Sequence, residues 1–330
     1  MTQYDIITYM NKIDILAIGD IATDAFIKIT EAEAKCDIGG EHCKLCLNYG
    51  GKIPYESNKI CHAVGNSSNF AIGASRLGLN LALMANMGND IDGADCLNVL
   101  KKENVDTSFI KIENGKPTNY HYVLWYQKEH TILTKHEEYK YEWPKNLEKE
   151  NSPSWIYLSS LGKNSLHFQD EIISYLERNQ NVKLAFLPGT FQIRFGVDAI
   201  KDIYKKTDVF FCNHNEAERI LEIEEKDISI LIEKIYALGP KLVVITDGIN
   251  GAYAYDGNEV IFVEAQPCDS FVETTGAGDA FASAFMTAYF NGKDIHTSLL
   301  WGSINAVSVI SHVGPHEGLL TRKEIEEKIG

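Results

Sequence analysis

Short apolar runs recur along the chain and alternate with stretches of helical periodicity. Six runs have the length of a buried strand: Ile13–Gly19, Leu81–Met87, Trp155–Ser159, Val182–Leu187, Val209–Cys212 and Leu242–Thr246. Between the first strands, Asn69–Leu77 has the apolar spacing of a helix, and Cys96–Lys102 is part of another. Continuous apolar strands are typical of a sheet that is covered on both faces. We therefore predict an α/β fold with a doubly wound, mostly parallel sheet flanked by helices.

Two segments interrupt this alternation. Residues Thr30–Cys61 are rich in glycine, cysteine and charge and show no helical period. Residues Asn119–His136 have the pattern of a β-hairpin with its turn at residues 127–130. Together with Phe26–Ile29 they are expected to form one small sheet, a β lid made of about residues 25–62 and 118–136. No flexible linker or repeat divides the chain, so residues 1–330 are expected to form one domain that carries this lid.

Charge and composition limit the partners and the location. The 330 residues include 31 Lys and Arg against 46 Asp and Glu, a formal net charge of −15. This balance disfavours nucleic acid and anionic membranes as partners. No apolar run approaches the roughly 18 residues of a membrane span, and residues 1–11 are too polar for a signal peptide. A soluble, cytoplasmic protein is expected, in which the seven cysteines do not form a disulfide framework.

The strongest chemical signal is the segment Glu273-Thr-Thr-Gly-Ala-Gly-Asp279, which precedes the apolar helical run Ala280–Tyr289. Small residues at 276–278 allow a ligand to approach the backbone, and the N-terminus of the following helix favours a phosphate. Asp279 is placed to accept a proton from an attacking hydroxyl. By itself the turn is equally compatible with an ordinary helix cap. The third glycine of a dinucleotide fingerprint is missing, and no P-loop sequence occurs.

This segment closely resembles the C-terminal signature D-T-T-G-A-G-D of the ribokinase-like (PfkB) carbohydrate kinases. Further resemblances follow along the chain in the family's order. They are the strand end Gly19–Asp24, the Gly-rich turn Gly65–Asn69 with the helix to Gly78, the N-x-x-E element Asn213–Glu216, and the T-x-G turn Thr246–Gly248 with Gly251. The resemblance covers almost the whole chain. It implies a single ribokinase-like kinase domain over residues 1–330.

The resemblance also implies a reaction and residue roles. An enzyme of this family transfers the γ-phosphate of Mg-ATP to a hydroxymethyl group of a small sugar. Asp279 would be the general base, and the backbone amides of Gly276, Ala277 and Gly278 would form the anion hole. The residues that would hold the substrate hydroxyls are Asp24, Gly65, Asn66 and Asn69.

Other residues are expected on the nucleotide side. Asn213 and Glu216 would organise Mg²⁺ and its waters, since this ion prefers oxygen ligands. Taken alone, the same pair is more typical of a helix cap and a solvated charge. Thr246 and Gly248 would line the nucleotide, and the helix around Asn305 would flank its adenine.

One position departs from the family pattern. Glu273 stands where the signature usually has Asp. In relatives that bind potassium, this carboxylate and a neighbouring carbonyl contribute to the loop around the ion. The longer side chain leaves potassium dependence open, while the base and the glycines are unchanged.

The cysteine-rich insertion, residues 30–61, allows two interpretations. Cys36, Cys43, Cys46 and Cys61 have the spacing C-x6-C-x2-C-x14-C, and one pair has the spacing of a zinc knuckle. Free thiols packed under a lid are the favoured interpretation, and structural Zn²⁺ is the second. A disulfide is the least expected outcome in a reducing compartment. The other three cysteines, Cys96, Cys212 and Cys268, are expected to be buried.

The substrate and the assembly stay open at this stage. Pro188–Gln192 is similar to a segment of nucleoside kinases in the same family, so a nucleoside is the alternative acceptor. A catalytically weak relative that serves as a metal-dependent binding or regulatory module is less favoured, because Asp279 and the glycines are kept together. The lid sheet is expected to pair with a second subunit, since an uncovered sheet promotes association.

Overall fold

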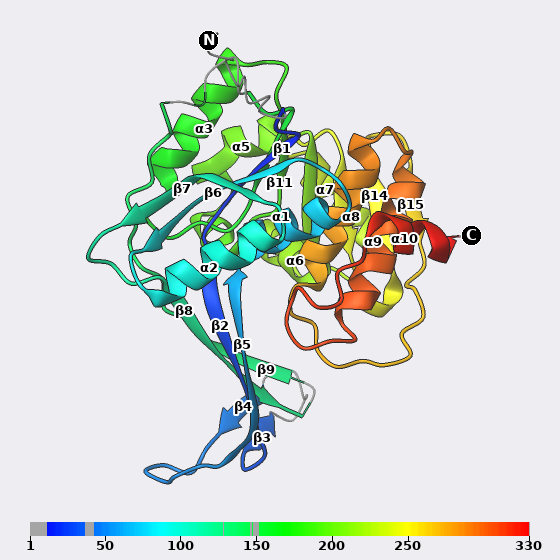
Figure 1. Cartoon of the computed structure of the whole chain (residues 1–330). Coiled ribbons are helices and arrows are strands. Elements are labelled where there is room, and N and C mark those ends of the chain that lie inside the picture. The colour runs from blue at the N-terminus through cyan, green and yellow to red at the C-terminus, as the bar shows by residue number, and fades with distance from the viewer. Residues whose placement is uncertain (1–11, 37–42, 128, 146, 148–151, 330) are drawn as a thin grey trace, which may run out of the picture.

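The computed structural model describes residues 12–329 except 37–42, 128, 146 and 148–151. Its main sheet has nine strands in the order β15-β14-β13-β12-β11-β10-β1-β6-β7 (Figure 1). The strands from β13 through β7 in this order, including β1 and β6, run parallel to one another. Strands β14 and β15 pair antiparallel. The bounds are β1 Ile15–Ile18, β6 Leu81–Gly88, β7 Asp106–Glu113, β10 Trp155–Leu158, β11 Lys183–Phe186, β12 Val209–Asn213, β13 Val243–Thr246, β14 Ala252–Tyr255 and β15 Val260–Val263. All six predicted strands are confirmed.

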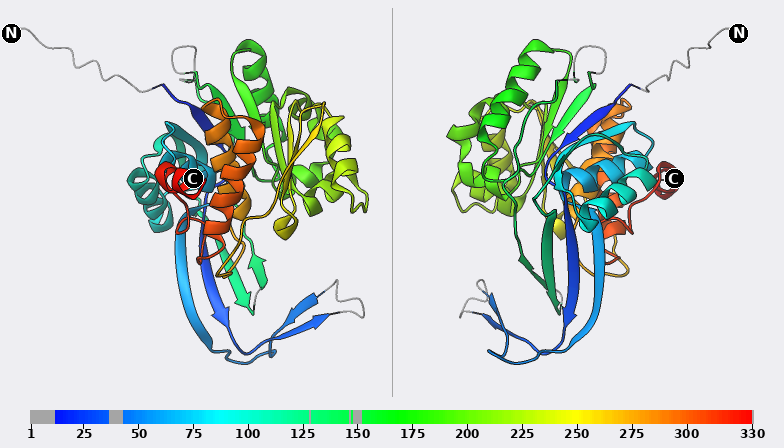
Figure 2. Two further views of the ribbon diagram at one scale, coloured as in Figure 1. Left: turned by 90° about the vertical axis from the view of Figure 1, so that its right-hand side faces the viewer. Right: turned by 60° about the vertical axis from the view of Figure 1, so that its left-hand side comes forward.

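Helices cover both faces of this sheet, as Figure 2 shows. One core contains side chains of α1 (Asn66–Arg76), α2 (Ile91–Lys102), α8 (Ala277–Phe290) and α9 (Ile295–Val309). The other contains side chains of α3 (Leu166–Arg178), α5 (Lys201–Lys206), α6 (His214–Leu221) and α7 (Ile228–Tyr236). Along β1, Ile15 and Ala17 enter the first core, whereas Leu16 and Ile18 enter the second. This alternation explains the continuous apolar runs and confirms the predicted fold class.

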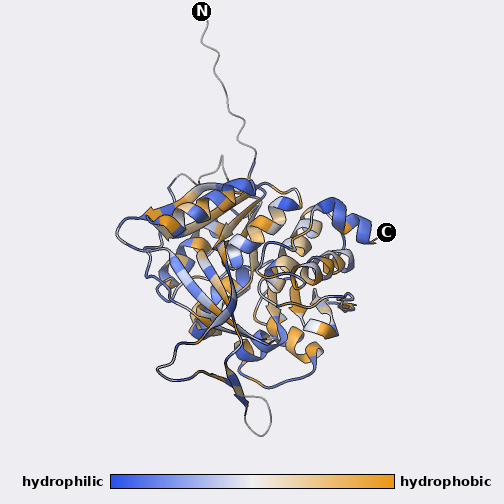
Figure 3. Ribbon diagram, turned by 60° about the horizontal axis from the view of Figure 1, so that its bottom comes forward, coloured by the Kyte–Doolittle hydropathy of each residue, from blue (hydrophilic) through white to orange (hydrophobic). Residues whose placement is uncertain are grey.

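Two shorter helices complete the chain. Helix α4 (Thr190–Phe195) follows β11, and α10 (Arg322–Ile329) ends the described chain. Figure 3 shows that α10, beside the C-terminus, is mostly hydrophilic. No helix in the described residues is long and apolar enough to cross a membrane.

A second sheet of four strands extends from the edge of the main body (Figure 1). Its order is β5-β2-β8-β9, with bounds β5 Tyr55–Val64, β2 Ala22–Ile29, β8 Asn119–Tyr126 and β9 Glu129–Leu133. Strand β2 pairs antiparallel with β5 and parallel with β8. Strands β8 and β9 pair antiparallel, which confirms the predicted hairpin. However, a single small sheet for the whole insertion is wrong, because β3 (Glu33–Cys36) and β4 (Cys43–Cys46) form a separate two-stranded sheet.

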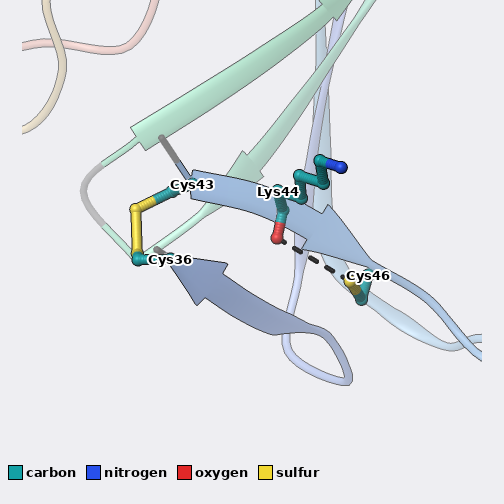
Figure 4. The surroundings of a disulfide bond; sticks show 4 residues. All are labelled: Cys36, Cys43, Lys44 and Cys46. Atoms are coloured by element: carbon teal, nitrogen blue, oxygen red, sulfur yellow. Dashed lines mark hydrogen bonds between the residues drawn. A yellow bond between two sulfur atoms is a disulfide. The ribbon is translucent and has the colours of Figure 1, made fainter. Parts of the chain in front are cut away.

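The four cysteines of the insertion do not converge on one site, but two of them pair. The β3–β4 register places Cys36 opposite Cys43, with their Cα atoms 3.9 Å apart, and the two form a disulfide (Figure 4). The preference against a disulfide is thus wrong. Cys43 and Cys46 lie three residues apart on one strand, and side chains at odd spacing point to opposite faces. Cys61 lies on β5 against Gly314. Within the described residues no group of three or more metal-ligating side chains exists.

The remaining three cysteines differ in their exposure. Cys96 and Cys212 are buried, as expected, whereas Cys268 is exposed. Cys268 lies in the loop between β15 and α8, where no sheet or helix covers it.

Candidate active site

The catalytic turn, residues 273–279, leads directly into helix α8. Gly276 has φ 80°, and a Cβ at this position would also collide with Pro315. Only glycine satisfies both constraints without strain. Helix α8 begins at Ala277, so the amides of its first turn have no partner within the helix, although the Ala277 amide donates to the Thr274 carbonyl of the preceding turn at 3.1 Å. They and the positive end of the helix dipole favour an anion at this turn.

Asp279 lies in the first turn of α8 and is only 5% exposed. Asn66 donates from Nδ2 to its Oδ1 at 2.9 Å, and Asn69 donates from Nδ2 to its Oδ2 at 2.8 Å. Burial raises the pKa of Asp279 to about 7, against the opposing effect of the two amides. A base with a pKa near neutrality is well matched to proton transfer. The sequence predicts that both asparagines bind the substrate; in the structure they donate to Asp279, the candidate base.

Glu273 is almost fully buried and binds backbone at two places. Its Oε2 accepts from the Thr275 amide at 2.6 Å, and its Oε1 accepts from the Gly314 amide at 2.7 Å. The longer side chain thus ties the catalytic turn to a loop 41 residues away in the sequence.

A cavity of about 460 Å³ adjoins the catalytic turn. Ala277 and Gly278 line it from the turn, and Thr246 and Gly248 line it from the end of β13. Most of its other walls are apolar, contributed by Ile249, Ala252, Phe271, Phe281, Ala306, Val307 and Ile310. This combination suits the flat apolar base of a nucleotide whose phosphates reach the α8 N-terminus. A larger cavity of about 650 Å³, between β7 and α3, includes no residue of the turn.

Asn305 does not line this cavity, contrary to expectation. Its side chain is fully buried, donating from Nδ2 to the Ala280 carbonyl at 2.9 Å and accepting from the Leu320 amide at 3.0 Å. Asn305 therefore holds α8 and the C-terminal segment together. Its helix, α9, still contributes Ser303 and Ala306 to the cavity wall.

Asn213 and Glu216 form a reciprocal cap at the start of α6. Asn213 Oδ1 accepts from the Glu216 amide, and Glu216 Oε2 accepts from the Asn213 amide, both at 2.9 Å. Burial raises the pKa of Glu216, and its charge in turn raises the pKa of Asp279. The Glu216 charge thus disfavours ionisation of Asp279, and a divalent cation nearby would offset this repulsion.

On the lid side, Asp24 is 7% exposed and receives a hydrogen bond from His121 Nδ1 at 3.1 Å. The β2–β5 register shifts between Ala22 and Asp24, and Ala63 in the extra stretch of β5 has φ 58°. A bulge of this kind changes the direction of neighbouring side chains. His121 was not identified from the sequence, because its pairing with Asp24 depends on two strands 97 residues apart.

Gly65 joins β5 to α1 with φ 120°, and a Cβ there would lie 2.5 Å from the Asp20 carbonyl oxygen. The expected substrate residues Asp24 and Gly65 are thus on neighbouring segments at the ends of β2 and β5.

Comparison with known proteins identifies the family. Residues 46–322 match the pfkB family carbohydrate kinases. The chain belongs to the PfkB family. An uncharacterized sugar kinase of Archaeoglobus fulgidus is 26% identical over 255 residues, which is 75% of this chain and 98% of that protein. The family assignment confirms the resemblance and makes the chain a sugar or nucleoside kinase.

Solved structures show the same fold. The nucleoside kinase of Methanocaldococcus jannaschii has a TM-score of 0.75 at 18% identity, covering 96% of this chain and 98% of that one. Arabidopsis thaliana ribokinase, solved with ribose and ATP, has a TM-score of 0.77 at 18% identity with the same coverage. The nine-stranded sheet of this PfkB kinase is therefore that of the ribokinase fold.

A further buried carboxyl group in this kinase, Asp20, was not identified from the sequence. Asp20, directly after β1, is 7% exposed and accepts from the Tyr141 hydroxyl at 2.7 Å. The Gly162 amide donates to the same hydroxyl at 2.9 Å. Burial raises the pKa of Asp20 to about 7. The available signal was the charged residue at the end of an apolar strand, where ligands of α/β sheets bind.

Proposed function

We propose that this PfkB kinase transfers the γ-phosphate of ATP to a hydroxymethyl group of a small sugar. The observation that carries the proposal is Asp279, a buried carboxyl group with a pKa near neutrality, at the N-terminus of α8 beside the nucleotide-sized cavity. The lid contributes a second carboxylate, Asp24, on the acceptor side.

The reaction follows from these positions. Asp279 accepts the hydroxyl proton as the acceptor oxygen forms a bond to the γ-phosphorus. The bond between that phosphorus and the β–γ bridging oxygen breaks, and ADP leaves with the electron pair. The amides of Gly276, Ala277 and Gly278 stabilise the negative charge on the transferring group. Asn66 and Asn69 orient the Asp279 carboxylate toward the acceptor.

Mg²⁺ is the expected companion of ATP. When bound, it neutralises phosphate charge during transfer. Asn213 and Glu216 would hold it through its waters, and the effect of the Glu216 charge on Asp279 fits a cation nearby. A potassium ion beside Glu273 is a further proposal; Glu273 already stabilises the loop around that position through two amides.

A nucleoside is the second candidate acceptor. Several rings lie close together beside Asp24. The ring centroids of His121 and His136 are 5.2 Å apart, and those of His136 and Phe191 are 5.3 Å apart. Phe191 belongs to the segment 188–192 that suggested a nucleoside kinase. Such a group of rings offers stacking surface to a base.

The lid is also the proposed dimer surface. Cross-strand register partners form a row on one face of the sheet in the order Ile60, Ala25, Tyr122 and Leu133. The three large side chains, Ile60, Tyr122 and Leu133, are 48%, 48% and 53% exposed. Large apolar side chains on an uncovered sheet favour pairing with a second copy. We also propose a cytoplasmic location, where ATP is available.

A screen for ADP release tests the proposed function. Mg-ATP is supplied with D-ribose, D-fructose or adenosine, each with parent enzyme and with Asp279→Asn. We expect acceptor-dependent ADP release by the parent only. Equal rates for parent and variant, or ADP release independent of every acceptor, would contradict the proposal.

A further inference from the structure

A loop near the C-terminus contacts the catalytic turn through consecutive residues. Gly314 donates its amide to Glu273 at 2.7 Å. Pro315 packs so closely on Gly276 that a Cβ there would collide with it. The next residue, His316, reaches the base itself through one intermediate side chain. Nothing in the motifs of the turn predicts these contacts, because the loop lies more than 30 residues after Asp279.

The intermediate side chain is Asn69. His316 Nε2 lies 2.9 Å from Asn69 Oδ1, and Asn69 Nδ2 lies 2.8 Å from Asp279 Oδ2. An amide has one donating end and one accepting end, so its orientation decides what Asp279 meets. With Nδ2 toward Asp279, the carboxylate receives a hydrogen bond. With the amide turned over, an oxygen would face an oxygen, and the ionised base would be destabilised.

The charge and tautomer of His316 decide this orientation. Arg76 donates to the His316 carbonyl at 2.6 Å and forms two hydrogen bonds with Glu103, at 2.7 and 2.8 Å. Burial, reinforced by the nearby Arg76 charge, lowers the pKa of His316 to about 4. The imidazole is therefore neutral near pH 7 and carries one N–H. Only the Nε2–H tautomer donates to Asn69 Oδ1.

We propose that His316 is a positioning residue for the catalytic base: its Nε2–H fixes the Asn69 amide so that Nδ2 stays on Asp279. The role rests on the proposed function only in taking Asp279 as the base. Asn66 binds the other oxygen of the Asp279 carboxylate. Part of the stabilisation of the ionised base therefore remains when His316 is removed. Charged groups act at both ends of this series of hydrogen bonds. Glu216 acts on Asp279, and Arg76, Glu103, Lys59 and Glu317 act on His316.

The kinetic test uses Mg-ATP with whichever of D-ribose, D-fructose and adenosine the parent phosphorylates. We expect His316→Ala to lower kcat about tenfold and to move the acid limb of the kcat profile up by about one pH unit, with KM little changed. His316→Gln, whose amide can donate from a similar position, should restore most of the rate. His312→Ala is the matched control, because His312 is exposed on the same loop and bonds only the Ser308 carbonyl of its own helix end.

A double-mutant cycle separates positioning from general loss of structure. If His316 acts through Asn69, His316→Ala should have almost no further effect on kcat in an Asn69→Ala background. Additive losses, or an unchanged pH profile in His316→Ala, would overturn the proposal.

A second measurement does not depend on the reaction. Long-range ¹H–¹⁵N NMR of the histidine rings, with His316 assigned from the His316→Gln variant, reports the tautomer and the charge. We expect a neutral Nε2–H ring from pH 5 to pH 9. A ring protonated on Nδ1, or one that titrates near pH 6.5, would overturn the proposal. This result stands even if the enzyme phosphorylates none of the acceptors tested. That outcome would count against the proposed function instead.

Discussion

The phosphate side and the lid side of this kinase are built in different ways. On the side proposed to bind phosphate, the turn, the glycines and the candidate base Asp279 lie within seven consecutive residues, and the proposed chemistry depends largely on backbone amides. On the lid side, Asp24 and its partner His121 come from strands 97 residues apart, and the proposed acceptor contacts depend on side chains. A local backbone device can be shared by a whole family, whereas an acceptor site assembled from distant strands can vary. The difference predicts that damage on the first side lowers kcat and damage on the second raises KM.

The largest effect is expected at the base. Asp279→Asn keeps the shape of the side chain but removes the proton acceptor and one of the two oxygens that accept from Asn66 and Asn69, so turnover should fall by roughly 10²- to 10⁴-fold. ATP affinity, measured by calorimetry, should be unchanged. Asp202→Asn, an exposed acid on α5, is the control. Turnover within tenfold of the parent would refute the assigned base.

The variant Asp24→Asn tests the lid side. The loss of a carboxylate that accepts hydrogen bonds from acceptor hydroxyls should raise KM for the acceptor about 10- to 100-fold. The KM for ATP should stay constant. An equal rise in both constants would remove the distinction between the two sides.

Two glycines separate backbone conformation from close packing. Gly276 and Gly292 have nearly equal φ values, 80° and 79°, but a Cβ at Gly292 meets nothing within 4 Å. Gly292→Ala should therefore cost only the conformational strain, about 1 kcal/mol in the free energy of unfolding. Gly276→Ala should cost more and also impair turnover, because Pro315 must move. Urea unfolding of both variants tests this; equal losses would show that the Pro315 contact is unimportant.

The smallest effect concerns stability and pH. Folding raises the pKa of Asp20 from 3.8 to about 7, so above pH 4 the unfolded chain releases a proton that the folded chain retains. The contribution of Asp20 to stability is complete below pH 4 and is lost as the pH rises to 7. Asp20→Asn should remove this loss and stabilise the fold at pH 8 by about 1–3 kcal/mol relative to the parent. A variant less stable than the parent at pH 8 would contradict the sign.

What the sequence predicts follows the same division. The parallel strands were evident because burial on both faces leaves continuous apolar runs, and Asp279 was evident because its motif is local. The cysteine spacing did not reveal the Cys36–Cys43 disulfide, because that pairing depends on the register of β3 and β4. The family resemblance placed the helix around Asn305 beside the adenine, but the side chain of Asn305 itself points into the core. His121 and His316 depend on long-range packing, which no short pattern encodes.

The central claim, transfer from ATP to a hydroxymethyl oxygen, is tested most directly by ³¹P NMR of the product. The enzyme is incubated with Mg-ATP and the acceptor that gives the highest rate, and the spectrum is recorded without proton decoupling. We predict a new phosphomonoester signal split into a triplet by two methylene protons, formed in step with ADP. A doublet, which reports a secondary hydroxyl, or inorganic phosphate as the only product, would contradict the account.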